Sequence, residues 1–142
     1  MSPIPLYAFA APIALSLLIG VMAMFSFVVA PSAFRLLPED QAGKFVRGVF
    51  PLYYPIVTVL CALAGVGLVA GGPILSKIMF GMAALGLIAW RVLMPRINAL
   101  RDRSLAGDAS AKKWFGRLHG LSFAINGAQF AAAVASLVLY VA

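Results

Sequence analysis

The residues with the most chemical potential lie in the last apolar stretch of the chain. They follow alternating steps of three and four residues, which keeps them on one helix face: His119, Ser122, Asn126, Gln129, Ala133, Ser136 and Tyr140. Because polar side chains inside a membrane span are costly against lipid, this face should point into a helix bundle or a wet cavity. Two interpretations stay open. The polar groups either join helices, at about 0.6 kcal/mol per hydrogen bond, or line a ligand pocket or polar pathway.

Further polar groups are expected near the same end of the bundle. They are Arg35 after the first apolar stretch, Tyr53, Tyr54 and Thr58 at the start of the second, and Arg91 and Arg96 at the end of the third. Arg91 lies about one turn inside its span, so its side chain must snorkel to the interface or find an anion. Turned inward, Arg91, Arg96 and His119 would bind a phosphate, a carboxylate or a lipid headgroup, since guanidinium forks match such groups. Tyr54 would gate this site or donate a hydrogen bond.

Metal and covalent chemistry find little support. His119 is the only histidine, and no His, Cys, Asp or Glu cluster has ligand spacing. A thiol and thioether site around Cys61 is disfavoured because the methionines should lie at other depths. All four carboxylates fall outside the apolar stretches, which excludes an intramembrane acid–base pair. We therefore expect no enzyme and no cofactor. The alternative is haem with His119 as its axial ligand, because haem iron needs only one proximal imidazole.

Composition then decides which elements must position these groups. The chain has 142 residues, of which 63% are apolar and 11% charged, too little polar surface for a soluble globule. Four stretches, at about 6–30, 50–70, 74–94 and 118–141, have the roughly 20 apolar residues that a transmembrane helix needs. The alternating pattern of barrel strands is missing. The prediction is an all-α integral membrane bundle of four transmembrane helices, forming a single domain over residues 1–142.

The charges predict the orientation of the bundle. Loops are expected at about 31–49 and 95–117, and together with Arg91 they carry every Lys and Arg except Lys77. The positive-inside bias places both loops in the cytoplasm and both termini outside. The net charge of +7 is then explained by orientation and by attraction to anionic headgroups, at about 1 kcal/mol per basic residue. We expect membrane lipids, and not nucleic acid, as partners.

Small residues recur at helix-packing spacing. The pairs and triplet are Ser16 with Gly20, Gly67 with Gly71, and Gly120 with Ala124 and Ala128. In lipid, close backbone approach at such residues drives helix association. They predict tight packing inside the bundle, or a contact with a second copy or another membrane subunit.

Four segments carry a resemblance to a known family. They are FVVAPSAF at 27–34, GVFPLYY at 48–54, MPRIN at 94–98, and FGRLHGLS at 115–122 followed by Asn126. This pattern resembles a bacterial family of small four-helix membrane proteins of unknown function, which is related to eukaryotic transmembrane protein 205. The resemblance covers essentially the whole chain, and it implies four spans with the distinctive residues at the cytoplasmic helix ends. The family is also loosely similar to copper-resistance and haem-associated membrane proteins, which keeps the haem alternative open.

These observations lead to one main expectation and two alternatives. We expect a non-enzymatic protein of the bacterial inner membrane, with both termini periplasmic and a tendency to form homo-oligomers. It would bind or help move a small solute, an anion or a lipid headgroup through Arg91, Arg96, His119, Ser122, Asn126, Gln129 and Tyr54. The alternatives are a haem-binding protein using His119 and a structural subunit of a larger membrane complex.

Overall fold

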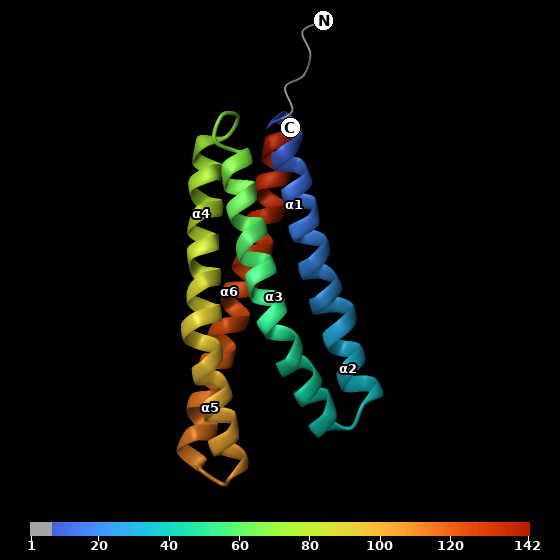
Figure 1. Ribbon diagram of the computed structural model, residues 1–142, viewed down its shortest axis with the longest axis vertical. Coiled ribbons are helices and arrows are strands. Elements are labelled where there is room, and N and C mark those ends of the chain that lie inside the picture. Colours follow the sequence, from blue (N-terminus) through green and yellow to red (C-terminus); the bar gives the residue numbers. More distant parts are fainter. Residues whose placement is uncertain (1–6) are drawn as a thin grey trace, which may run out of the picture.

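The protein is a bundle of long helices (Figure 1). The structure, a computed structural model, describes residues 7–142, and within that range it contains no strand. Its elements are α1 (Tyr7–Ala23), the π-helical segment η1 (Met24–Val29), α2 (Ala30–Leu36), α3 (Glu39–Gly67), α4 (Pro73–Ile88), the π-helical segment η2 (Ala89–Leu93), α5 (Met94–Leu105) and α6 (Ala109–Val141). Four continuous helical runs are long and apolar enough to cross a membrane: Phe9–Leu36, Glu39–Gly67, Pro73–Leu105 and Ala109–Val141. The predicted all-α membrane bundle of four helices is confirmed.

The loops expected at 31–49 and 95–117 are wrong, because most of these residues are helical. The non-helical connections shrink to residues 37–38 and 106–108. Asp108 starts α6 by accepting the Ala111 backbone N–H at 3.0 Å, which satisfies one of the free donors of the first turn. Hydropathy marks where the chain leaves the membrane, whereas a helix ends only where caps or prolines stop it. α6 has 33 residues and is about 50 Å long, well beyond the roughly 30 Å of the hydrocarbon core.

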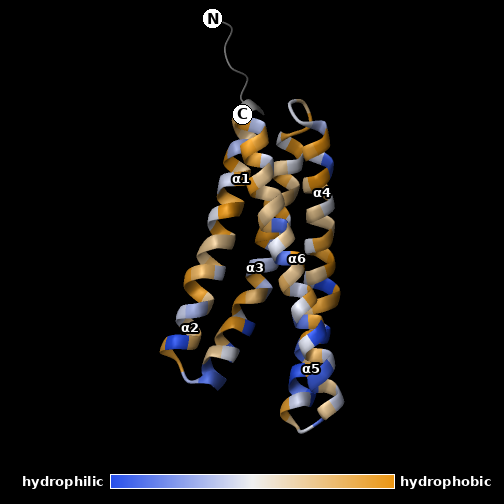
Figure 2. Cartoon of the chain, turned by 180° about the vertical axis from the view of Figure 1, so that it is seen from behind, coloured by the Kyte–Doolittle hydropathy of each residue, from blue (hydrophilic) through white to orange (hydrophobic). Residues whose placement is uncertain are grey.

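The helices are arranged as a ring. α3 packs between α1 and α4, and α6 packs against α1 and α4 from the other side, which leaves α3 and α6 on a diagonal. α2 and α5 lie at one end of the bundle, and the α3–α4 turn lies at the other (Figure 1). Most hydrophilic residues gather at the α2 and α5 end (Figure 2), which we call the basic end.

The two halves of the chain share one plan. In each half a helix passes through a π-helical segment into a short helix, turns tightly, and returns as a long helix. Each π segment stops two residues before a proline, Pro31 or Pro95. A proline has no N–H and its ring collides with the carbonyl four residues earlier, so one wider turn accommodates it. We refer to residues 7–67 and 73–141 as the amino-terminal and carboxy-terminal hairpins.

At the end of the bundle opposite to the basic end, the helix backbones pack in close contact. A Cβ atom on Gly67 would lie 2.7 Å from the backbone nitrogen of Ala11, so only glycine lets α1 and α3 meet there. Ser76 on α4 donates to the Gly65 carbonyl oxygen at 2.7 Å and joins α4 to α3 at a neighbouring level. The helices are thus locked together at this end by backbone contact.

Candidate functional site

Two neighbouring tyrosines of α3 reach across the diagonal of the ring to α6. The Tyr53 hydroxyl donates to Asn126 Oδ1 at 2.7 Å, and the Tyr54 hydroxyl shares a hydrogen bond with Ser122 Oγ. Both tyrosines are buried. The rings of Phe25 and Tyr53 lie 4.5 Å apart between centroids, so hydrophobic rings surround the hydroxyl bonds. Three predicted site residues, Tyr54, Ser122 and Asn126, therefore lie close together inside the bundle.

A second polar contact lies further along α6. Gln129 is 1% exposed, and its Nε2 donates to the Met82 carbonyl oxygen on α4 at 3.0 Å. The Thr58 hydroxyl on α3 is buried beside it and has no hydrogen-bond partner. A Cβ atom on Gly86 would lie 2.6 Å from Thr58 Oγ1 and 2.9 Å from Gln129 Nε2. The bare backbone of α4 at Gly86 thus lets α3, α4 and α6 meet at one point.

The predicted cationic residues lie elsewhere. Arg91, Arg96 and His119 are exposed. The Arg91 guanidinium lies over the Trp90 ring at 4.4 Å, and the His119 imidazole stacks on Phe115 with 5.6 Å between centroids. The structure therefore does not bring these three together with Ser122, Asn126 and Gln129 as the expected pathway requires. Burial of a charge inside a span is costly, and near the end of a helix a long side chain reaches the interface instead.

Further cations lie on α5 and α6, where Arg101 is half-buried and Arg117 is exposed. Arg101 lies over the Phe115 ring at 5.3 Å, and Arg117 lies over the Trp114 ring at 5.1 Å. Lys112 and Lys113 are exposed beside them. We call this set the aromatic-backed basic surface: Arg91, Arg96, Arg101, Lys112, Lys113 and Arg117, with Trp90, Trp114 and Phe115. The ion pairs found among the described residues use other cations, so this surface keeps its positive charge.

Two acidic residues near this surface are already engaged. Arg47 donates to both carboxylate oxygens of Asp102, at 2.6 and 3.0 Å, and joins α3 to α5. The pKa of Asp108 is lowered because its carboxylate accepts the Ala111 N–H, the Ser110 hydroxyl and Arg103. Both carboxylates stay charged at neutral pH, and each is occupied by an arginine of its own.

Sequence reasoning missed some of the partners and one glycine. Tyr53 was expected nearby but not as the partner of Asn126, and Gly86 was not placed opposite Gln129. A small residue on α4 facing an inward polar residue on α6 is the signal that could have found the second. For metals, the described residues contain no group of three or more His, Cys, Asp and Glu side chains that could hold an ion. The haem alternative at His119 stays a prediction.

Comparison with known proteins identifies the family. A model described as a domain of unknown function, DUF4149, matches residues 13–105. An uncharacterized protein of Aquifex aeolicus (strain VF5) is 30% identical over 116 residues, which cover 79% of this chain and 80% of that protein. No solved structure matches the chain. The helical membrane bundle with a polar diagonal described above is thus a member of the DUF4149 family.

Proposed function

We propose that this protein is a non-enzymatic protein of the bacterial inner membrane that binds anionic lipid headgroups at its basic end. Both termini would be periplasmic, and the basic end would face the cytoplasm. The observation that carries the proposal is the aromatic-backed basic surface. Three of its four arginines rest on aromatic rings, and its cations have no acidic partner in the described chain. The kinship with eukaryotic transmembrane protein 205 belongs to the same proposal and is supported by the motifs of the four helix ends.

The physical argument rests on where charge and aromatic rings meet. Tryptophan and tyrosine favour the level of the headgroups, and a cation over a ring is attracted by its negative face. Trp90 and Trp114 would therefore hold Arg91 and Arg117 within the interfacial region, where the headgroups lie. Each basic residue near an anionic surface contributes about 1 kcal/mol. The interior polar groups bond to each other across the ring, so we assign binding to this surface and not to a pathway through the bundle.

The two tryptophans of the chain make the proposal directly testable. Both belong to the proposed surface, so lipids with brominated chains quench their fluorescence when they occupy it. We expect brominated phosphatidylglycerol to quench more strongly than brominated phosphatidylcholine in otherwise identical vesicles. In the triple variant Arg96→Ala, Lys112→Ala and Lys113→Ala, the two lipids should quench the fluorescence almost equally.

Lys77 provides the matched control, because it is exposed at the opposite end of the bundle. Lys77→Ala should keep the preference for the anionic lipid. Equal quenching by both lipids in the native protein would refute the proposal, and so would a preference for the anionic lipid that persists in the triple variant.

Self-association is the second part of the proposal. Gly116, Gly120 and Gly127 are exposed on α6, and no heavy atom lies within 4 Å of the position a Cβ would take. Such a face lets another helix approach closely in lipid. Gly120→Leu should lower the oligomer mass measured by light scattering after size exclusion. Gly81→Leu on α4, where space is equally open, should leave the mass unchanged.

A further inference from the structure

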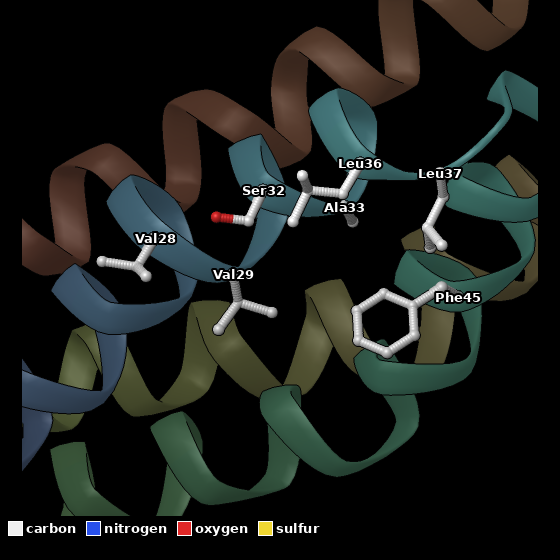
Figure 3. A pocket seen from close by; sticks show the side chains of 7 residues that line it. All are labelled: Val28, Val29, Ser32, Ala33, Leu36, Leu37 and Phe45. Carbon is white, nitrogen blue, oxygen red and sulfur yellow. The ribbon is translucent and has the colours of Figure 1, made fainter.

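The amino-terminal hairpin carries a long open groove on one side. One hollow of about 510 Å³ lies between α1, η1 and α3, and a second of about 380 Å³ lies between α2 and α3. Val29 lines both, so the two hollows adjoin and together form the groove. On α3 the lining residues Phe45, Val49, Leu52 and Ile56 follow steps of four, three and four, which is one helix face. Figure 3 shows the second hollow, with Phe45 opposite the side chains of α2.

Missing side-chain volume produces the groove. Gly20 lines the first hollow, and no heavy atom lies within 4 Å of the position of its absent Cβ. Ser16 in the first hollow and Ser32 and Ala33 in the second are also small. From Ser16 to Leu37 the groove follows the helices for roughly 30 Å, at about 1.5 Å per residue, which is close to the thickness of the hydrocarbon core.

The interior of the groove suits a hydrocarbon chain. It lies within two membrane-spanning runs, and aliphatic and aromatic side chains form most of its lining. The Tyr53 hydroxyl is bonded to Asn126, so Tyr53 presents its ring to this side. The side chains that line an open space lose dispersion contacts on that side unless a lipid chain fills the space.

Charges of both signs stand at the end of the groove. Arg35 follows Val28 by seven residues and so lies on the same face of the helix; it is exposed and forms none of the ion pairs of the described residues. Glu39 begins α3 two residues after Leu37, which lines the second hollow, and it is also free of an ion pair among the described residues. The remaining charges, Lys44 and Asp40, pair with each other at 3.4 Å. The groove therefore ends at one free cation and one free anion.

We propose that this groove binds one acyl chain of a zwitterionic aminophospholipid, whose phosphate lies at Arg35 and whose ammonium lies at Glu39. An anionic lipid does not complement both charges, because Glu39 repels it. A lipid with a fully methylated amine keeps the positive charge but has no N–H to donate to Glu39, so it binds less well than the primary ammonium. This site lies on the amino-terminal hairpin, apart from the aromatic-backed basic surface. Its result is therefore independent of the function proposed above.

A tryptophan placed in the groove reports on its occupant. In a background with Trp90→Phe and Trp114→Phe, Phe45→Trp places a single indole among the lining residues. We expect brominated phosphatidylethanolamine to associate about threefold more strongly than brominated phosphatidylcholine, which is the lower end of the net contribution of one hydrogen bond. Glu39→Gln should abolish this preference, whereas Arg35→Ala, which removes the partner of the phosphate common to both lipids, should weaken the association of both. Leu52→Trp, in the first hollow, is a second reporter if Phe45→Trp fails to fold.

Phe123→Trp is the control, since Phe123 is 74% exposed on α6; it should show no preference between the two lipids. Equal association of both lipids at Phe45→Trp would overturn the proposal, as would a preference that survives Glu39→Gln or an association that Arg35→Ala leaves unchanged. Stronger quenching by phosphatidylglycerol would overturn it in favour of an anionic occupant. Absence of quenching at Phe45→Trp, together with quenching at Phe123→Trp, would mean that protein covers the groove and would overturn it as well.

Discussion

Gly86→Ala tests the contact at which α3, α4 and α6 meet. The added Cβ would lie 2.6 Å from Thr58 Oγ1 and 2.9 Å from Gln129 Nε2, and real Cβ atoms essentially never show contacts under 3.0 Å. Thr58 is β-branched, so its Oγ1 can move away only by a change to the other χ1 rotamer that threonine adopts in a helix. Gln129 is longer, but moving it breaks its hydrogen bond to the Met82 carbonyl oxygen.

The expected loss of stability follows from three contributions. Overpacking of a well-packed interior costs about 1–3 kcal/mol, and the broken interhelical hydrogen bond adds about 0.6 kcal/mol. Replacing glycine by alanine in a helix returns at most about 1 kcal/mol. We therefore expect Gly86→Ala to lower the free energy of unfolding by about 1–3 kcal/mol.

Reversible unfolding in mixed micelles, followed by circular dichroism, measures this loss. Gly81→Ala is the matched control, because it lies on the same helix and no heavy atom is within 4 Å of its missing Cβ; it should be neutral or slightly stabilising. Thr58→Ala should relieve much of the damage in the Gly86→Ala background, and because Thr58 Oγ1 has no hydrogen-bond partner it should cost little alone. Equal stability of Gly86→Ala and Gly81→Ala would refute this account of the interface.

Three further predictions concern other parts of the molecule. Tyr54→Phe removes the bond to Ser122 and should destabilise the protein by about 0.6 kcal/mol in the same unfolding assay; no change would mean that the bond contributes nothing. Because the pKa of Asp108 is lowered by folding, its contribution to stability is present above the unfolded-state pKa of about 3.9 and disappears as the pH falls below it. In Asp108→Asn the free energy of unfolding should therefore depend less on pH below about pH 4. An unchanged dependence on pH would contradict the lowered pKa of Asp108. In intact cells, and in a background without the native cysteine, an impermeant maleimide should label Lys77→Cys and not Ser110→Cys; the reverse pattern would invert the orientation.

The sequence predicts the membrane class well and the helix ends poorly. Apolar runs report the solvent around a segment, which is why the four spans were found. They say nothing of where hydrogen bonding along the backbone stops, so α2, α5 and the first turns of α6 were mistaken for loops. The prolines Pro31 and Pro95 did not end their helices, because the preceding π-helical turns absorb them.

The candidate site was likewise predicted only in part. Helical spacing predicts that Ser122 and Gln129 share a face, and the structure buries both. Spacing cannot name a partner on another helix, so the bonds from Tyr53 and Tyr54 needed the arrangement of the ring. Spacing also does not show whether a polar side chain is buried or reaches water. His119 follows the same spacing as Ser122 and Gln129, yet it lies near the basic end and is exposed.

The shared plan of the two hairpins gives the bundle an approximate internal symmetry. Both hairpins start at the same end of the bundle, so exchanging them corresponds to a half-turn about an axis along the bundle, the arrangement that parallel repeats have in membrane proteins. The exchange maps the α1–α3 contact onto α4–α6 and the α3–α4 contact onto α1–α6, and all four contacts are present. A two-fold dimer of a single hairpin would have the same geometry. The two hairpins differ where α3 and α6 meet across this axis, because one supplies the tyrosine hydroxyls and the other supplies Ser122 and Asn126.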